Sequence, residues 1–316
     1  MRAVQATLLA LSGGVGGAKL ALGLYRVLPP DTLTVVANTG DDFEHLGLSI
    51  SPDLDTLLYT LSRQDNPELG WGRIGETWNF MVALNGLGGE TWFRLGDRDL
   101  AMHVVRTHRL RTGEGLSAII DEFRDRFGIT ARILPMSDDP VRTRVLTGHL
   151  WLDFQDYFVR FRCEPEISEI AFAGATNARP HPDFLAALAD PKLHAVVICP
   201  SNPFISIDPI LALPGVREAL QACPAPVVAV SPIIAGQAVK GPTAKMMAEL
   251  GLPVDAATVA RHYKDFLDLY IADEEDAEAV EDLEVPVVLA RTLMRSLDDR
   301  EALANTVLAA ADKIRK

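Results

Sequence analysis

The feature that most constrains this chain is a glycine-rich segment, Ser12–Lys19, that lies between a short apolar run and a helical pattern. The run Thr7–Leu11 predicts a buried strand, and Ala18–Leu28 predicts a helix that ends before Pro29 and Pro30. Glycines at such a turn let backbone N–H groups approach an anion, and the helix N-terminus adds partial positive charge. The segment therefore predicts a phosphate-binding loop, with a tight turn that binds nothing as the alternative.

The glycine-rich segment matches neither of the two familiar nucleotide-binding motifs. In a P-loop a Ser or Thr would follow the lysine, but Lys19 is followed by Leu20. Lys19 also stands where the dinucleotide motif needs a third small residue. Asn38, rather than an acidic residue, follows the second predicted strand, Leu33–Ala37, so a nicotinamide dehydrogenase is disfavoured. We expect Lys19 to reach a phosphate from the start of its helix.

Short β-rich runs alternate with helical patterns along the chain, which predicts βαβ units around a mostly parallel sheet. Further parallel strands are predicted at Ala195–Cys199 and Val227–Val230, whereas Val141–Leu146 and Leu150–Phe161 flank Gly148 as an antiparallel excursion. The other predicted helices are Glu76–Leu84, Leu100–Leu110, Ser117–Phe127 and Asp298–Ile314. No linker, repeat or low-complexity segment stands out, so the chain is not divided further.

Charge and cysteine spacing narrow the class of protein. The net charge of -13 repels phosphate backbones, so nucleic acid is not expected as a partner. Cys163, Cys199 and Cys223 form no CxxC pair, which argues against a zinc site or disulfide framework and favours a reducing compartment. No apolar run approaches the roughly 20 residues of a membrane span, and Met1–Leu11 is interpreted as a strand rather than an export signal. We expect a cytoplasmic protein with no membrane partner.

Two acidic segments are candidates for a metal site. Asp41 and Asp42 directly follow the second strand, where paired carboxylates suit Mg²⁺, with a solvated acidic turn as the alternative. The segment Ser51–Thr56 predicts a helix start with Ser as N-cap and Pro at the first position. Asp53 and Asp55 fall in its first turn, where they complement the helix dipole or, alternatively, hold a metal or a hydroxyl group.

A mixed-charge turn, Trp92–Asp99, is predicted to follow a strand. In the functional interpretation, Arg94 or Arg98 binds an anion or a planar ring. In the alternative, the charges form an ion-pair network with a helix cap at Asp97 or Asp99. The turn is therefore a candidate for substrate recognition.

Two polar turns, Pro200–Pro203 and Ser231–Ile234, follow predicted core strands and should share a sheet edge with the glycine-rich segment. Their Ser and Asn side chains suit a nucleobase or ribose, whereas their prolines alone would mark sharp turns. The acidic run Asp273–Glu284 is interpreted as a solvated face or loop. Four histidines without metal-ligand spacing are interpreted as structural or surface residues: His45, His103, His108 and His149.

Taken together, these motifs resemble the 2-phospho-L-lactate transferase family of coenzyme F-420 biosynthesis, over nearly the whole chain. The motifs that carry the resemblance occur in order as SGGVGGAK, NTGDD, SPDLDT, GWG, ETW, LGDRD, LPMSDDPV, HLWLDFQDYFV, PSNPFISIDPIL, SPIIAG and KGPTAK. A single motif would be weak evidence, but this many motifs in order are specific.

The resemblance implies an α/β fold: a Rossmann-like, mostly parallel sheet with helices on both faces and an inserted smaller α+β portion. We expect one unit over residues 1–316, with the substrate-covering insertion at roughly residues 75–190. It also implies a Mg²⁺-dependent transferase, usually a homodimer. Its donor is a guanosine diphosphate conjugate of 2-phospholactate, phosphoenolpyruvate or phosphoglycerate, its acceptor is the deazaflavin Fo, and GMP is released.

By position, the resemblance implies that Asp55 and Arg94 contact Fo, and that Asp41 with either Asp53 or Asp55 binds the metal. The residues implied for the nucleotide are Ser12, Gly13, Gly14, Val15, Gly16, Lys19, Ser201, Asn202, Pro203 and Ser231.

In the implied reaction, Lys19 and backbone N–H groups stabilise charge, and Asp55 accepts or orients the proton of the attacking hydroxyl. The identity of the acid and the choice between Asp53 and Asp55 as metal ligand stay open. The alternative function is a non-catalytic, nucleotide-sugar-binding regulatory protein of the same superfamily.

Overall fold

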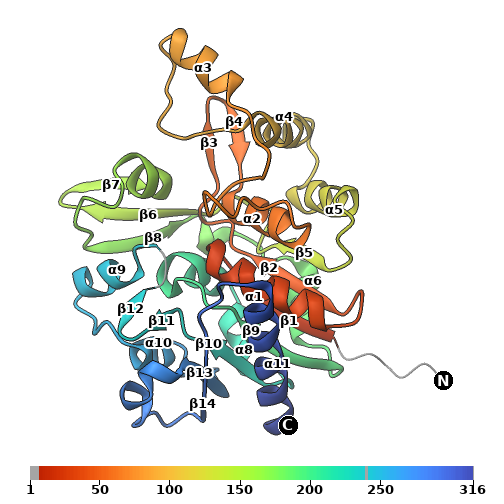
Figure 1. Cartoon of the computed structure of the whole chain (residues 1–316), viewed down its shortest axis with the longest axis vertical. Coiled ribbons are helices and arrows are strands. Elements are labelled where there is room, and N and C mark those ends of the chain that lie inside the picture. The colour runs from red at the N-terminus through yellow and green to blue at the C-terminus, as the bar shows by residue number, and fades with distance from the viewer. Residues whose placement is uncertain (1–6, 239–240, 316) are drawn as a thin grey trace.

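The computed structural model describes residues 7–238 and 241–315. Its centre is a seven-stranded sheet in the order β14-β13-β10-β9-β1-β2-β5, in which every neighbouring pair is parallel (Figure 1). The strands are β1 (Thr7–Ser12), β2 (Leu33–Ala37), β5 (Arg132–Pro135), β9 (Leu193–Ile198), β10 (Val227–Val230), β13 (Leu269–Asp273) and β14 (Val287–Ala290). The chain starts near the middle of the sheet and extends it on both sides, which confirms the predicted Rossmann-like fold.

Helices cover both faces of the sheet because its strands are apolar on both faces. In β1, Leu9 and Leu11 belong to one hydrophobic cluster, and Leu8 and Ala10 belong to the other. The second cluster is covered by α1 (Gly14–Val27), α2 (Pro52–Leu61), α5 (Leu116–Arg126) and α11 (Leu297–Lys313). The first is covered by α6 (Pro182–Leu188), α7 (Asp208–Leu211), α8 (Val216–Gln221), α9 (Thr243–Glu249) and α10 (Ala256–His262).

Helix α1 begins at Gly14, four residues before the predicted start at Ala18. Gly13 is the N-cap, with an extended φ of -149°, and the Asp53 carboxylate accepts a hydrogen bond from the N–H of Gly14 at 2.8 Å. The glycines predicted to form a loop before Ala18 therefore belong to the helix from Gly14 onwards, so that prediction was wrong after Gly13. Glycine is a poor helix former, and the contact with Asp53 from a distant segment stabilises this turn.

Strands β13 and β14 were not among the predicted elements. The acidic run Asp273–Glu284 starts at the end of β13 and connects it to β14. The run contains two short 3-10 helices, at 274–276 and 278–280, and Asp273 and Asp276 are buried, so the prediction of a solvated face or loop was wrong for these two residues. Asp273 accepts hydrogen bonds from the backbone N–H and the hydroxyl of Thr292, so its carboxylate holds the chain after β14.

Smaller elements lie above and beside the main sheet (Figure 1). One group is an antiparallel sheet in the order β7-β6-β8, and another is the β3–β4 hairpin with α3 and α4. Their bounds are β3 (Phe43–His45), β4 (Leu48–Ile50), α3 (Asn79–Gly86), α4 (Asp97–Arg111), β6 (Arg142–Thr147), β7 (Leu150–Asp153) and β8 (Glu169–Ala173). The antiparallel pair was predicted, but β7 ends at Asp153, and Asp156–Arg160 forms a π-helix, η1.

The insertion proposed at residues 75–190 stays a prediction. This range includes β5, which is the edge strand of the main sheet, as well as the smaller elements outside it. The remaining elements are the two-stranded ribbon β11 (Ile233–Ile234) and β12 (Gln237–Ala238), the π-helix η3 (Pro203–Ile207), and the 3-10 helices η2 (Ala175–Asn177), η4 (Glu274–Asp276) and η5 (Glu278–Val280). Among the described residues, no helix combines the length and apolar character that a membrane span needs.

Candidate functional site

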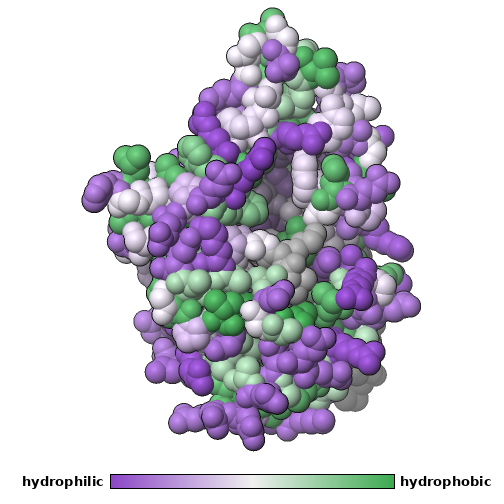
Figure 2. All heavy atoms as spheres, turned by 60° about the vertical axis from the view of Figure 1, so that its left-hand side comes forward, coloured by the Kyte–Doolittle hydropathy of each residue, from purple (hydrophilic) through white to green (hydrophobic). Residues whose placement is uncertain are grey.

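Segments that follow β1, β2, β9 and β10 surround a cavity of about 620 Å³ at the carboxyl edge of the sheet. Figure 2 shows the surface hollowed between the projecting upper part of the molecule and the main body. The predicted site residues that line the cavity are Gly13, Gly14, Val15, Gly16, Lys19, Asp41, Asp53, Asp55, Arg94, Ser201, Asn202 and Ser231. Ser12 and Pro203 were also predicted, but they are buried and are not among the described lining residues.

The start of α1 is packed against the turn that follows β9. The N–H of Gly13 donates to Oγ of Ser201 at 3.2 Å. A Cβ atom on Gly16 would lie only 2.5 Å from the carbonyl oxygen of Pro200, so this position requires glycine. The first helical turn thus faces the cavity with backbone N–H groups that have no partner within the helix, which is the arrangement that binds anions.

Lys19 lies one turn further along α1 and also lines the cavity. Its Nζ atom donates to the carbonyl oxygen of Met294, at 3.1 Å, in the segment between β14 and α11. The ammonium group is therefore held at the cavity wall by main chain from the other end of the sequence.

Asp41 and Asp53 are the buried carboxylates nearest the glycine-rich turn. Asp53 accepts hydrogen bonds from the N–H of Gly14 at 2.8 Å and from Nδ2 of Asn38 at 3.0 Å. Burial raises the pKa of Asp53 to about 6, although these two hydrogen bonds oppose the shift. Burial and the nearby Asp53 carboxylate raise the pKa of Asp41 well above its usual range.

The surplus negative charge at these two carboxylates is suited to a divalent cation. Oδ1 of Asp41 is buried and has no hydrogen-bond partner among the described residues. A buried, unpaired oxygen beside a second carboxylate matches the oxygen ligands that Mg²⁺ prefers. Asp42, which the sequence paired with Asp41, accepts instead from the Ser51 hydroxyl at 2.8 Å and is not among the described lining residues.

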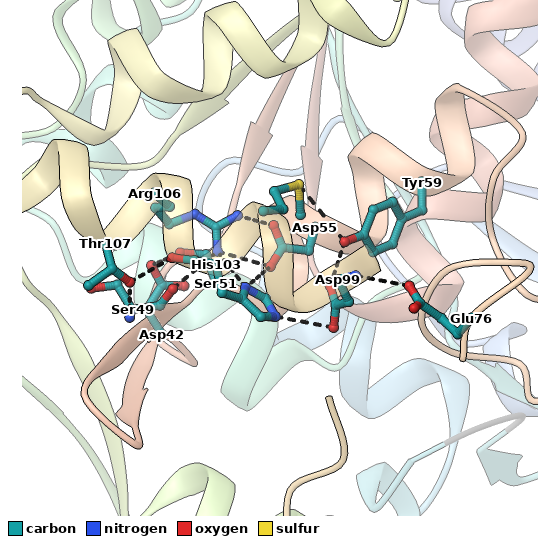
Figure 3. Close-up of polar contacts among 11 residues, drawn as sticks. Asp42, Ser49, Ser51, Asp55, Tyr59, Glu76, Asp99, His103, Arg106 and Thr107 are labelled. Atoms are coloured by element: carbon teal, nitrogen blue, oxygen red, sulfur yellow. Dashed lines mark hydrogen bonds and ion pairs between the residues drawn. The ribbon is translucent and has the colours of Figure 1, made fainter. Parts of the chain in front are cut away.

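Asp55 lies in a different environment, although it is only two residues from Asp53. Arg106 of α4 donates to both of its carboxylate oxygens, with Nη1 at 3.1 Å from Oδ2 and Nη2 bound to Oδ1 (Figure 3). Nδ1 of His103 lies 3.7 Å from Oδ2 of Asp55. Burial raises the pKa of the Asp55 carboxyl, and the Arg106 guanidinium opposes that shift.

His103 links Asp55 to Asp99, which lies one turn earlier on α4. Nε2 of His103 lies 3.1 Å from Oδ2 of Asp99, and the Tyr59 hydroxyl donates to the other oxygen of Asp99. His103 is buried, which fits the structural rather than the surface interpretation, but the sequence did not indicate that it also lines the cavity. The missed signal is the i, i+4, i+7 spacing of Asp99, His103 and Arg106, which places them on one helix face.

Arg94 lies at the aromatic side of the cavity. Its guanidinium carbon lies 4.2 Å from the ring centroid of Trp78 and 5.9 Å from that of Trp71. No strand precedes it, so the predicted strand before this turn was wrong, and residues 91–96 are irregular. Trp71, Trp92, Phe93 and Phe158 add aromatic surface to the same cavity.

Acidic side chains also connect α3 and α4, because each helix start is bound by a carboxylate from the segment next to the other helix. Asp97 accepts hydrogen bonds from the N–H groups of Asn79 and Phe80 at the start of α3. Glu76 accepts from the N–H groups of Arg98 and Asp99 at the start of α4. The prediction that Asp97 or Asp99 caps the helix after this turn was wrong, because α4 begins at Asp97 with Gly96 as its N-cap, and the Asp97 carboxylate binds the start of α3 instead.

The polar turns after β9 and β10 are stabilised by the side chains that were predicted to bind a nucleotide. Oδ1 of Asn202 accepts from the N–H of Phe204 at 2.9 Å. Oγ of Ser231 accepts from the N–H of Ile233 at 3.1 Å. Both side chains line the cavity as well, so they shape its wall and keep further hydrogen-bonding capacity towards it.

Comparisons with known proteins show which family the chain belongs to. The profile of the family described as 2-phospho-L-lactate transferase CofD matches residues 8–298. The chain is 41% identical to a phosphoenolpyruvate transferase of Kitasatospora aureofaciens, with 98% of each chain covered. It is also 41% identical to a 2-phospho-L-lactate transferase of Methanosarcina mazei, with 95% of this chain and 98% of that protein covered.

The fold is shared with a solved structure from Bacillus halodurans, a member of the upf0052 family, with a TM-score of 0.67. That structure is 16% identical and covers 97% of this chain and 99% of its own, so the likeness concerns the fold alone. The family match and the two transferases go further, because they span almost the whole chain at substantial identity. The chain therefore belongs to the 2-phospho-L-lactate transferase family, whose members are enzymes that transfer a phosphate-containing group.

Proposed function

We propose that this protein transfers a phosphorylated three-carbon acid from its guanosine diphosphate conjugate to the ribityl hydroxyl of the deazaflavin Fo, in coenzyme F-420 biosynthesis. The observation that carries the proposal is that one cavity is lined by a glycine-rich helix start, buried carboxylates, and an arginine among aromatic rings. A phosphate donor, a metal ion and a planar acceptor each need one of these three features.

In the proposed reaction, the ribityl oxygen attacks the phosphorus atom that bears the three-carbon acid. A new P–O bond forms, the bond between that phosphorus and the bridging oxygen of GMP breaks, and GMP leaves with the electron pair. The hydroxyl proton passes to a carboxylate. Catalysis of this kind depends on positioning and on stabilising charge, which preorganised N–H groups and cations provide.

We assign the metal to Asp41 and Asp53. Support comes from the unpaired Oδ1 atom of Asp41 and from the raised pKa of both carboxyls, which a cation would reverse. Asp55 is the less suitable ligand because Arg106 already binds both of its oxygens. A bound Mg²⁺ would neutralise charge on the diphosphate oxygens.

The donor diphosphate is assigned to the first turn of α1. The N–H groups of Gly13 and Gly14 are bound by Ser201 and Asp53, so Val15 and Gly16 are the backbone donors best suited to an anion. Lys19 adds positive charge from the same helix, and Ser201, Asn202 and Ser231 face the guanosine portion. In this assignment Lys19 is a catalytic residue that stabilises the charge developing on GMP.

The acceptor is assigned to the opposite set of residues. Asp55 accepts or orients the proton of the ribityl hydroxyl, which is the role that the family resemblance suggested. Arg94 and the tryptophans beside it offer a cationic and aromatic surface for the deazaflavin ring. Phosphoenolpyruvate and phospholactate transferases are equally similar to this chain, so the proposal names the donor only as a three-carbon acid.

We also propose that the protein acts as a cytoplasmic homodimer. The support is an exposed apolar surface around α3, where the side chains of Val82 and Leu87 are 72% and 88% exposed. Light scattering at micromolar concentration should give twice the monomer mass of 34.4 kDa. A mass equal to the monomer would contradict the dimer.

The transfer itself is tested by incubating the protein with Fo, Mg²⁺ and guanosine diphosphate conjugates of the three acids, followed by mass spectrometry. We expect a Mg²⁺-dependent Fo adduct with one acid preferred. A folded protein that forms no adduct with any donor but binds nucleotide sugars would favour the non-catalytic alternative.

A further inference from the structure

A buried polar cluster lies between α2 and α4, beside the residues assigned to metal and phosphate. We call it the Asp55 network, and its members are Asp55, Tyr59, Asp99, His103 and Arg106 (Figure 3). The first two come from α2 and the other three from α4. All except Arg106 are among the residues that line the cavity. The guanidinium therefore lies behind Asp55, and the cavity lies in front of it.

Arg106 is 0% exposed, and it is the largest of the fully buried side chains among the described residues. A buried ion pair is weak evidence for stability, because desolvation of both charges offsets their attraction. Its geometric effect is stronger, since a planar guanidinium that binds both carboxylate oxygens fixes the plane of the carboxylate. Asp55 also lines the cavity, and a carboxylate oxygen that accepts one hydrogen bond has the capacity to accept a second.

The orientation of His103 follows from the same contacts. A guanidinium can only donate, and Nη1 of Arg106 lies 3.3 Å from Nδ1 of His103. In the neutral imidazole this contact favours Nδ1 as the acceptor and the ring proton on Nε2, which lies 3.1 Å from Oδ2 of Asp99. The imidazole is held on both sides, with Tyr59 supporting Asp99 from α2.

Ligand atoms of Asp55, Asp99 and His103 lie within 4.8 Å of one another, which is also compatible with a metal site. The guanidinium bound to Asp55 argues against a cation there, because a second positive charge would compete for the same oxygens. These contacts are therefore better suited to orienting the Asp55 carboxylate than to binding a metal ion.

We propose that Arg106 is a positioning residue for the acceptor hydroxyl, because it fixes the Asp55 carboxylate towards the cavity, with His103 as a secondary support. The inference rests on the proposed function, in which Asp55 meets the ribityl hydroxyl of Fo. It predicts that a change at Arg106 acts through Asp55 and leaves the nucleotide side of the cavity intact.

The test is a double-mutant cycle of Arg106→Lys and Asp55→Asn in the full-length protein. Lysine keeps the charge but loses the two-point contact. Arg106→Lys should lower kcat by about 10- to 100-fold, the range expected when a reacting group is misplaced, while the affinity for GDP measured by calorimetry stays unchanged. Arg106→Lys should then have no further effect in the Asp55→Asn background.

The matched control is Arg109→Lys on the same helix. Arg109 pairs with Glu114 and Glu122 on the surface and is not among the described lining residues. Its variant should keep wild-type kcat. The double-mutant cycle is measured in two ways, by single-turnover rates and by the Kd of Fo from calorimetry. The Kd still tests the coupling of the two residues where the turnover of Asp55→Asn is below detection.

Equal factors for Arg106→Lys in both backgrounds, in both readouts, would overturn the inference, as would a wild-type kcat for Arg106→Lys. A defect confined to GDP affinity would overturn it as well. Should Arg106→Lys not fold, His103→Gln provides the second test, with a smaller fall in kcat that is again absent in the Asp55→Asn background. Full turnover of Asp55→Asn would instead refute the assignment of Asp55 in the proposed function, which is a distinct result.

Discussion

Two ends of the same cavity are built in different ways. At the phosphate end, the first turn of α1 is fixed by contacts with the start of α2 and with the turn after β9, from Gly14 to Asp53 and from Gly13 to Ser201. At the acceptor end, Asp55 and Arg94 are fixed by side chains of α4 and of the tryptophans. The phosphate end relies on backbone geometry, whereas the acceptor end relies on long side chains. Substitutions at the two ends should therefore fail in different ways.

The largest effect is expected at the phosphate end, from a substitution of one of the two carboxylates assigned to Mg²⁺. Asp41→Asn removes the carboxylate charge assigned to Mg²⁺ and replaces one of its two oxygens with an amide nitrogen that cannot bind a cation, so kcat should fall by about 1,000-fold. The measurement is the initial rate over a Mg²⁺ titration. Asp153→Asn, at an exposed carboxylate paired with Arg144, is the control and should leave the rate unchanged. A wild-type Mg²⁺ dependence for Asp41→Asn would remove Asp41 from the metal site.

Gly16→Ala should disturb the phosphate end through the backbone. Its Cβ would lie 2.5 Å from the carbonyl oxygen of Pro200, a rigid neighbour, so unfolding free energy should fall by about 2–3 kcal/mol. Affinity for GDP should fall with it. Gly86→Ala in α3 is the matched control, because its Cβ meets nothing within 4 Å. Equal urea midpoints for the two variants would show that the close approach is not needed.

Asp53→Asn should reveal the cost of the buried charge at the phosphate end. The pKa of Asp53 is raised from 3.8 to about 6, so the folded state binds the proton more tightly than the unfolded chain. Wild-type stability should therefore fall as pH rises from 4 to 6. In the absence of Mg²⁺, the stability of the variant relative to wild type should rise by about 3 kcal/mol between pH 3 and pH 8, because only the wild type must ionise this buried group.

That gain should disappear towards pH 3, which lies below both pKa values, so that Asp53 is largely protonated in the folded and the unfolded wild type. Urea unfolding at a series of pH values, with a chelator present, measures it. A difference that is constant over the whole range would mean that Asp53 has an ordinary pKa.

Arg94→Ala should change the acceptor end alone, and by the smallest amount. Loss of its contacts with Trp78 and Trp71 should raise the KM for Fo by about 2- to 5-fold, the value of one cation–π contact at an exposed site. The affinity for GDP should not change. Arg98→Ala is the comparison, since Arg98 is exposed and is not among the described lining residues. An equal rise in KM for both variants would contradict the assignment of Arg94.

The same contrast explains how much the sequence could predict. The phosphate end follows from local pattern, because Gly13–Gly17 and Asp41 directly follow strands whose carboxyl ends meet at one edge. The sequence could not show that Asp53 binds Gly14, which starts α1 four residues early, because that contact joins segments 39 residues apart. Nor could it pair Asp55 with Arg106, 51 residues away, since a charged residue on a helix is usually solvated.

The edge strands were also beyond the sequence pattern. β14 is only partly buried, and its four apolar residues, Val287–Ala290, follow shortly after the acidic run, so the local pattern does not indicate a core strand. Their place in the sheet depends on pairing with β13 rather than on local propensity. Arg94 was found from its motif, but the aromatic rings around it come from segments on both sides of α3.

The most direct test of the account is the ratio of GMP released to Fo adduct formed, measured in one reaction by mass spectrometry. Transfer between the two ends of one cavity predicts equal amounts of both products, and neither product when Fo is omitted or Mg²⁺ is chelated. GMP release without Fo, or an Fo adduct that forms without Mg²⁺, would contradict the proposed coupling of a metal-bound donor to the acceptor hydroxyl.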